Sequence, residues 1–274
     1  MFNKTVRNYL GLNKTSGQIG IEVEMETSGS IDRDAFSPVW RVEDDGSLRG
    51  YGQEFVLQTP CNMDQVEDVL ALVTSGLKKQ RVSIQESIRA GVHIHLNMQE
   101  NPVNDVFKLL GCYYLMETAL TRFCGEGREG NLFCLRGRDA TYAIDCATEA
   151  YKATDLYGLR TQSLRYSSLN VQSLFQYGSV EFRGLGTTKD LSNIKIWCMI
   201  LMKLKEYATK VKNPWDNIME ISGVGGRQWM TNIFGEELME HLDYPDLEWD
   251  IIQDTRNAQF FCHAISGKFN ELQE

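Results

Sequence analysis

The sequence predicts an α+β fold, and three features of the chain carry that prediction. Residues 19–27 alternate apolar and polar side chains, as expected for a strand with one buried face. Asp45-Gly46 stands between two apolar runs and is typical of a hairpin turn. Apolar residues at helical spacing within 63–79 and 191–204 predict amphipathic helices that pack against the strands.

Size, composition and charge limit the classes of protein to consider. The chain has 274 residues, 42% of them hydrophobic and 24% charged, which suits one large globular domain or one domain with an appendage. The net charge of -9 opposes general affinity for nucleic acid, so we expect any anionic ligand to be held locally.

Targeting features are equally plain. The first 20 residues hold no run long enough for a signal peptide, and the most apolar stretch, 196–202, is too short to span a bilayer. Seven scattered cysteines without a Cys-x-x-Cys pair favour free thiols over disulfides or structural zinc. We therefore expect a cytoplasmic protein with no membrane partner.

The first strand separates its side chains by type. Residues 1–17 before it are polar and mixed, and we expect an arm or short helix that closes on the body. Within 19–27, the odd-numbered positions are apolar and face a core, while three carboxylates line the other face: Glu22, Glu24 and Glu26. On its own this pattern favours a solvated acidic face; a cation between the carboxylates is the alternative.

A hairpin and a helix follow. Residues 39–42 form the second predicted strand, and 51–57, which carries Glu54, returns as its partner and ends at Thr59-Pro60. For Asp44 and Asp45 between the two strands, simple turn chemistry is the favoured interpretation. The helix over 63–79 completes the order strand, strand, strand, helix.

The middle of the chain holds a histidine pair and an unusual loop. Residues 92–97 predict a strand with His93 and His95 on one face. Asn101-Pro102 predicts the start of one long apolar helix through residue 123. Residues 124–138 mix glycine with arginine; a mobile solvated loop is the favoured interpretation, and a lid that covers phosphate or substrate is the alternative.

The last third predicts two strands and then helices. The strands cover 165–171 and 179–186, with a turn at 176–178, and Asp190 caps the helix that follows. Beyond 214 we expect short helices broken at 223–226, with the acidic stretch 236–254 as a solvated face. The expected organisation is an arm over 1–17, a catalytic domain over 18–212 and a helical appendage over 213–274.

Charged side chains recur two residues apart, or stand singly, on four predicted strands. They are Glu22 and Glu24, then Glu54, then His93 and His95, and finally Glu181 and Arg183. If the strands share one sheet, these groups converge on one surface and form a divalent-cation site. Carboxylates suit Mg²⁺, an imidazole favours Mn²⁺, and an arginine beside them provides a fork for phosphate oxygens or a developing oxyanion.

Taken in order, the motifs resemble the amidoligase family, whose relatives include glutamine synthetase and glutamate-cysteine ligase. The matching segments are Gly20-Ile21-Glu22-Val23-Glu24, Asp45-Gly46-Ser47-Leu48, Glu54, Gly91-Val92-His93-Ile94-His95, Arg165-Tyr166 with Asn170, Val180-Glu181-Phe182-Arg183 and Gly186-Thr187-Thr188. The resemblance spans roughly residues 18–205. It implies a curved, mainly antiparallel sheet of the glutamine synthetase type, with helices packed on its convex face.

The resemblance also implies an activity and a role for each residue. It implies an ATP-dependent ligase that uses Mg²⁺ or Mn²⁺ to join a small-molecule or peptide carboxylate to an amine through an acyl phosphate. The implied metal ligands are Glu22, Glu24, Glu54, His93 and Glu181, with Glu26, Asp44 and Asp45 as further candidates. His95, Arg183 and Asn170 resemble nucleotide-binding residues, and Arg183 and Arg165 resemble the arginines that act on the phosphate and the reacting carboxylate.

Two other functions remain open at this stage. His93-x-His95 with Glu100 is similar to the metal motif of cupin barrels, although Ser87 stands where that motif has glycine and its later histidine is missing. A non-enzymatic interaction protein, which would bind through the acidic strand and the tryptophan-rich C-terminal region, is the second alternative.

Overall fold

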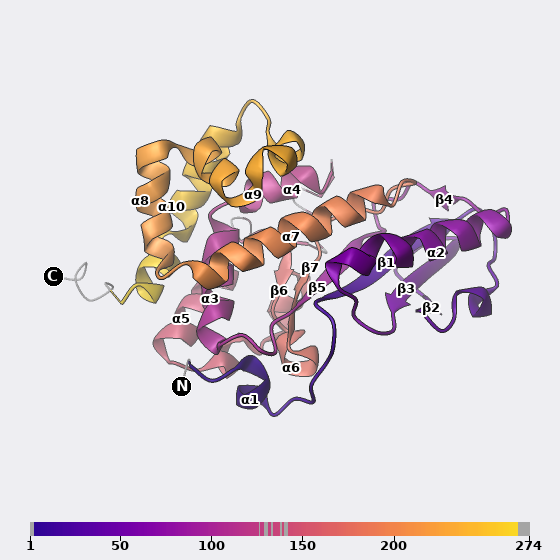
Figure 1. Ribbon diagram of the computed structural model, residues 1–274, viewed down its shortest axis with the longest axis horizontal. Coiled ribbons are helices and arrows are strands. Elements are labelled where there is room, and N and C mark those ends of the chain that lie inside the picture. Colours follow the sequence, from indigo (N-terminus) through magenta and orange to yellow (C-terminus); the bar gives the residue numbers. More distant parts are fainter. Residues whose placement is uncertain are drawn as a thin grey trace.

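A computed structural model describes residues 3–125, 127–128, 131–132, 134–137, 139 and 142–267. Within these residues, seven strands form one open sheet in the order β2-β3-β1-β5-β7-β6, and β4 pairs with β1 beyond the end of β5 (Figure 1). Every pairing is antiparallel. The strands are β1 (Ile19–Thr27), β2 (Trp40–Asp44), β3 (Tyr51–Leu57), β4 (Ile84–Gln85), β5 (Val92–Asn97), β6 (Leu169–Asn170) and β7 (Ser179–Phe182). The predicted α+β fold is confirmed at this level.

The described part of the chain contains ten α-helices. They are α1 (Val6–Leu10), α2 (Val66–Lys79), α3 (Val103–Tyr114), α4 (Glu117–Phe123), α5 (Tyr142–Lys152), α6 (Leu174–Tyr177), α7 (Ser192–Lys210), α8 (Pro214–Val224), α9 (Gly226–Leu242) and α10 (Leu247–Ile265). Short 3-10 segments cover Arg33–Phe36, Met63–Gln65, Leu156–Leu159 and Gln162–Tyr166. None of the described helices combines the length and the apolar character that crossing a bilayer requires.

Helices α2, α3 and α7 cover the apolar face of the sheet. Figure 1 shows α2 and α7 lying across the strands. The indole of Trp40 on β2 donates to the carbonyl of Val69 on α2 at 2.9 Å. On β7, Phe182 packs edge-on against Tyr113 of α3 and Trp197 of α7, with ring centroids 5.5 and 6.5 Å apart. Because β1 buries every second residue against this layer, its carboxylates are all left on the opposite, polar face.

The N-terminal segment closes on the body through a short helix, as expected. Val6, at the start of α1, is fully buried, and its amide donates to the carbonyl of Asn101 at 2.9 Å. The amide of Arg7 donates to the carbonyl of Gln99 at 3.0 Å. These bonds dock α1 beside the segment that joins β5 to α3.

The prediction of a single long helix over 101–123 is wrong. The chain forms α3 and α4, separated at Leu115 and Met116, where the φ of Met116 is -136°. The amide of Thr118 donates to the carboxylate of Asp254 on α10 at 2.7 Å. A carboxylate from a distant helix therefore satisfies a first-turn amide of α4, which lets a new helix begin there.

The late strands are shorter than predicted. Of residues 165–171, only Leu169–Asn170 belong to a strand, and the residues before them form a 3-10 segment. The strand expected over 179–186 ends at Phe182, and β4 had no recognisable signal. The turn predicted at 176–178 is the end of α6, where Gly178 adopts a φ of 71°.

The acidic stretch 236–254 is not simply a solvated face. Asp250 and Asp254 are 6% and 2% exposed. Asp250 accepts hydrogen bonds from the guanidinium of Arg122 and the hydroxyl of Tyr244, both at 2.9 Å. These buried carboxylates hold α10 against α4, which a count of charges along the sequence does not reveal.

Candidate active site

The register of the sheet brings the predicted residues together. Three cross-strand pairs carry them on the polar face: Glu22 with His93, His95 with Glu181, and Glu24 with Glu54. All six side chains point the same way, because residues directly opposite each other in an antiparallel pair lie on the same face. Four strands, β3, β1, β5 and β7, thus contribute to one patch of imidazole and carboxylate groups.

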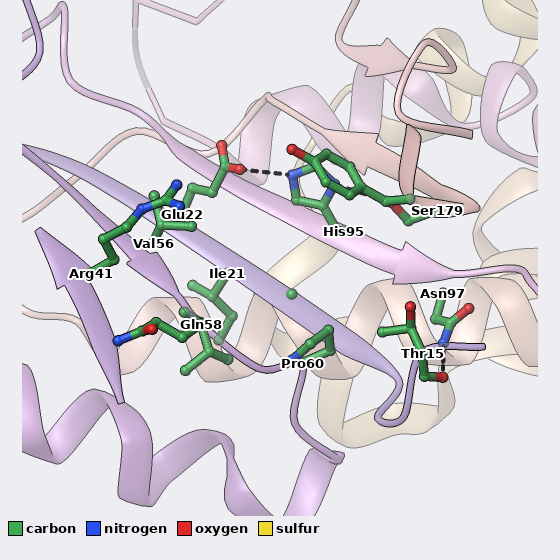
Figure 2. Close-up of a pocket in the computed structure, with 13 residues that line it drawn as sticks. Thr15, Ile21, Glu22, Arg41, Val56, Gln58, Pro60, His95, Asn97 and Ser179 are labelled. Atoms are coloured by element: carbon green, nitrogen blue, oxygen red, sulfur yellow. Dashed lines mark hydrogen bonds and ion pairs between the residues drawn. The ribbon is translucent and has the colours of Figure 1, made fainter. Parts of the chain in front are cut away.

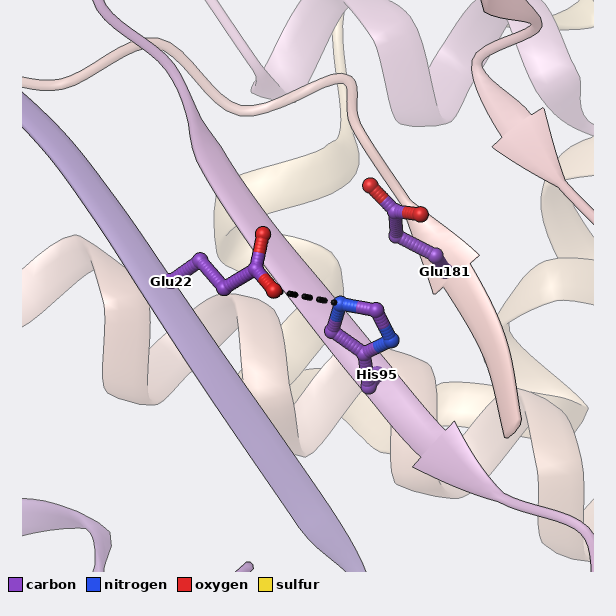
Figure 3. Close-up of side chains that lie close together, drawn as sticks. All are labelled: Glu22, His95 and Glu181. Carbon is purple, nitrogen blue, oxygen red and sulfur yellow. Dashed lines mark ion pairs between the residues drawn. The ribbon is translucent and has the colours of Figure 1, made fainter. Parts of the chain in front are cut away.

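The two histidines lie among the carboxylates. His93 Nδ1 is 3.2 Å from Glu22 Oε2 and 3.6 Å from Glu181 Oε1. His93 Nε2 is 3.6 Å from Glu24 Oε1. His95 Nε2 is 3.3 Å from Glu22 Oε1, and Figure 3 shows this ion pair with Glu181 beside it. Glu22 therefore contacts both imidazoles, one with each of its oxygens.

Two sets of side chains have the geometry of a cation site. One is Glu22, His95 and Glu181, and the other is Glu22, Glu54 and His93; in each set the ligand atoms lie within 4.8 Å of one another. Ligands on opposite sides of one cation stand about 4.2 Å apart, so small side-chain rotations suffice for both sets. The donors are hard oxygens and imidazole nitrogens, which suit Mg²⁺ or Mn²⁺.

Titration in the patch reflects its mixed charges. Burial alone would raise the pKa of Glu22, but hydrogen bonds with His93 and His95 outweigh it and hold that pKa well below its usual range. Burial, together with the charge of Glu22, raises the pKa of Glu54 to about 7. The pKa of His95 is raised: burial opposes its charged form, and Glu22 and Glu181 more than compensate.

Glu181 is held from the side away from β5. The amide nitrogen of Asn170 on β6 donates to Glu181 Oε2 at 2.6 Å, and the guanidinium of Arg183 donates to Oε1. Glu24 is fixed similarly, because its Oε2 accepts from the amide of Gly91 at 2.9 Å. Both carboxylates are thereby oriented before any ligand arrives.

Two pockets flank the patch. The first, of about 340 Å³, is called here the tyrosine pocket (Figure 2), and its lining includes Arg41, Val56, Pro60, His95, Tyr177 and Ser179. The second, of about 390 Å³, is called the arginine pocket, and its lining includes Asp45, Ser47, Arg89, Arg128, Arg165 and Arg183. Glu22 lines both pockets and so marks their border.

The residues predicted to bind nucleotide do not all lie in one pocket. His95 lines the tyrosine pocket, while Arg183 and Arg165 line the arginine pocket. Asn170 lines neither pocket and instead holds Glu181. The three residues that resemble nucleotide-binding residues thus lie in three different surroundings, and their shared nucleotide role stays a prediction.

The further acidic candidates have other partners. Glu26 Oε1 accepts from the amide of Arg49 and the hydroxyl of Ser87, both at 3.0 Å, and so ties the β2–β3 turn to the segment before β5. Asp44 pairs with Arg33. Asp45 accepts from the amide of Ser47 at 2.8 Å within its own turn, in agreement with the simple turn chemistry expected there.

The glycine- and arginine-rich segment is docked in its described residues. Arg128 and Arg136 are 6% and 8% exposed, and Arg136 binds Asp139 at 2.7 Å. The amide of Gly137 donates to Glu117 Oε2 at 2.7 Å. The expectation of a solvated loop is therefore wrong for these residues; Arg138 lies outside the described residues.

Some pocket residues escaped sequence reasoning. Arg41 lies opposite Val56 in the β2–β3 pair, so counting alternate residues along the hairpin would have placed it on the polar face. Tyr177 comes from the end of α6 and packs edge-on against His95, with ring centroids 6.0 Å apart. Arg89 comes from a connecting segment, where no periodicity predicts direction. Arg128 lies in the glycine- and arginine-rich segment, for which the sequence offered only a lid over phosphate or substrate as the alternative interpretation.

A family model described as "Putative amidoligase enzyme" matches residues 23–204, about two-thirds of the chain. The chain belongs to this amidoligase family. The match contains the residues of the patch except Glu22, which lies one residue before it, and most of the residues that line the two pockets. The family name indicates a ligase that joins a carboxylate and an amine. No curated protein matches the sequence of this chain.

The cupin alternative loses its support in the structure. The amidoligase sheet is open rather than closed into a barrel. Glu100, the third residue of the cupin-like pattern, forms an ion pair with Arg7 at 3.0 Å and belongs to neither set of candidate ligands.

Proposed function

We propose that this amidoligase is an ATP-dependent carboxylate-amine ligase that acts through an acyl phosphate. The position of Glu22 carries the proposal. This half-buried carboxylate belongs to both candidate cation sets and lies at the border of two pockets of different chemistry. A reaction between a metal-bound triphosphate and a second anionic substrate needs such an arrangement, because the two substrates must meet beside the cations.

The tyrosine pocket is the proposed nucleotide site. Its walls include Val56 and Pro60, which suit an apolar base, and the ring of Tyr177 offers an aromatic surface. Arg41 lines the same pocket and has the guanidinium that phosphate oxygens favour. His95 and Glu22, 3.3 Å apart, both line this pocket, and the phosphates would approach the carboxylates there.

The two ligand sets, together with Glu24, would hold Mg²⁺ or Mn²⁺. Cations bound there would neutralise phosphate charge as the γ-phosphoryl group is transferred. The number and chemistry of the donors fit such ions, since Glu22, Glu54 and Glu181 supply oxygens and His93 supplies a nitrogen.

The arginine pocket is the proposed site of the acid. The acid's carboxylate oxygen attacks the γ-phosphorus, ADP leaves, and an acyl phosphate forms. The nitrogen of the amine then attacks the acyl carbon, the C–O bond to phosphate breaks, and the nitrogen passes its surplus proton to the departing phosphate. Arg183 and Arg165 donate hydrogen bonds to the oxyanion that develops at the acyl carbon.

The remaining proposals concern architecture. We assign catalysis to residues 18–212 and a supporting role to residues 213–274, whose helices pack against α3, α4 and α7. We also propose that the sheet is of the glutamine synthetase type. An open antiparallel sheet, with its candidate ligands on the face opposite the helices, supports this assignment.

The decisive experiment is ADP release with Mg²⁺ or Mn²⁺ in the presence of pooled acids and amines, with the coupled product identified by its mass. We expect ADP formation to require the acid, and Glu22→Gln and Arg183→Ala to abolish it without unfolding the protein. The proposal fails if Mg-ATP neither binds nor stabilises the wild-type protein, because a nucleotide site must raise stability by RT ln(1 + [L]/Kd).

A further inference from the structure

Arg128 is a buried cation that has no anionic partner among the described residues. Its side chain is 6% exposed, and within the described residues no carboxylate lies within ion-pair distance of it. Nε donates to the carbonyl of Gly184 at 2.7 Å, and one terminal nitrogen donates to the carbonyl of Arg183 at 2.8 Å. Buried charges are normally paired, because moving a charged group from water into the protein interior without a counter-charge costs roughly several kcal/mol.

The guanidinium is directed toward the candidate cation ligands. A β-carbon added to Gly91 would lie 3.3 Å from Arg128 Nη2, 3.4 Å from Glu24 Oε2 and 3.5 Å from His93 Nε2. The three groups thus surround one small space above Gly91. Nη1 has no hydrogen-bond acceptor among the described residues, and Arg128 lines the arginine pocket.

The arginine pocket is lined by carboxylates and by arginines. Its carboxylates include Glu22, Glu24 and Glu54, which are the proposed cation ligands. With those ligands bound to cations, Arg128 keeps a full positive charge in a buried position. Arg165, on the same pocket, also has no described carboxylate within ion-pair distance. Since no described carboxylate completes this environment, an anion of the ligand is the group that suits it.

We infer that Arg128 is a substrate-binding residue whose Nη1 binds an oxyanion of the acid substrate. This inference rests on the proposed function and adds a residue to it. The ligand group is the reacting carboxylate and, after phosphorylation, the phosphoryl oxygens of the acyl phosphate. Because the other donors of Arg128 bind the main chain at Arg183 and Gly184, the guanidinium of Arg128 is fixed relative to the strand that carries Arg183.

A purely structural role for Arg128 makes a different prediction. If its only task were to tie its segment to the end of β7, replacement would lower thermal stability but leave anion affinity unchanged below the melting temperature. An anion-binding role predicts the loss of affinity in protein that is still folded. Affinity for a simple anion therefore separates the two roles.

Inorganic phosphate in the presence of MgCl₂, without nucleotide, is the probe, and calorimetry of the full chain is the measurement. We expect Arg128→Gln to bind phosphate about 10- to 100-fold more weakly, as for loss of one charge-assisted hydrogen bond. Arg128→Lys should recover part of the affinity, because it keeps the charge but not the planar fork. Arg256→Gln, on the exposed face of α10, is the matched control and should bind as the wild type does.

A folded Arg128→Gln protein with wild-type phosphate affinity overturns the inference. If the variant does not fold, the same question is asked of the wild type by arginine-selective labelling and mass spectrometry. Phosphate should then slow the labelling of Arg128 but not that of Arg256, and equal labelling with and without phosphate overturns the inference.

The test also separates this inference from the proposed function. Phosphate binding needs no turnover, so a protein that binds phosphate through Arg128 but never releases ADP supports the anion site and refutes the ligase. An active ligase whose Arg128→Gln variant binds phosphate normally supports the ligase and refutes the anion site.

Discussion

Replacing Glu22 with glutamine is the sharpest test of the patch, because one carboxylate serves both candidate cation sets. Without metal, the variant loses charge-assisted contacts to His93 at 3.2 Å and His95 at 3.3 Å. Such contacts contribute roughly 1.5–3 kcal/mol, and about 2 kcal/mol lowers the melting temperature by roughly 4–8 °C in a protein of this size. Because the pKa of Glu22 is lowered in the folded state, this stability is present above the carboxylate's ordinary pKa and is lost as pH falls below it.

With metal, the expected loss is larger. Even residues that only orient a metal ligand change affinity about 10- to 100-fold, so the loss of a shared ligand should weaken Mn²⁺ binding by at least about 100-fold, or about 2.7 kcal/mol. Calorimetric titration with MnCl₂ at pH 7 measures this directly.

Glu26→Gln is the matched control for this titration. Glu26 lies on the same strand and face but belongs to neither ligand set, and glutamine can still accept from Arg49 and Ser87. Unchanged Mn²⁺ affinity in folded Glu22→Gln protein would refute the proposed cation site.

Three further changes test other parts of the structure. Tyr177→Ala should raise the KM for ATP about 10-fold with little change in kcat, since an aromatic surface for a base contributes roughly 1–3 kcal/mol; equal KM values would remove the base from the tyrosine pocket. Burial raises the pKa of Glu117 to about 8, so the stability of the wild type should fall as pH rises from about 5 to 8. Glu117→Gln should remove this part of the pH dependence. If the urea midpoint changes by the same amount between pH 5 and pH 8 in the wild type and in Glu117→Gln, the assignment is wrong. Asp254→Ala removes the acceptor of two 2.7 Å bonds from Thr118 and should cost about 2–4 kcal/mol in urea unfolding; a loss below about 0.5 kcal/mol would show that α10 does not stabilise the start of α4.

The sequence predicted the strands that carry the patch better than the helices that support it. β1, β3 and β5 match the expected segments, since alternation reports directly which side of a strand is buried. The sequence predicts the convergence of Glu22, Glu54, His93 and Glu181 only if their strands share one sheet. Register between strands far apart in sequence depends on tertiary packing, and no local pattern encodes it.

Other features could not be read from local patterns. Asp250 and Asp254 look solvated by composition, yet both are buried because Arg122, Tyr244 and Thr118 happen to face them from other elements. The same holds for Arg128, whose direction depends on carbonyls at the end of β7. Whether a charged side chain can be buried depends on the groups that pair with it, and these come together only when the chain folds.

The candidate cation ligands and the arginines that face them have different origins in the fold. The former sit on paired strands, whereas Arg89, Arg128 and Arg165 project from connecting segments that tolerate change in length and composition. If these arginines bind the acid as proposed, family members could differ in the acids they accept by exchanging these connections while the candidate cation ligands on the sheet stay unchanged. Grafting such segments between family members is accordingly a direct route to new amide-forming specificities.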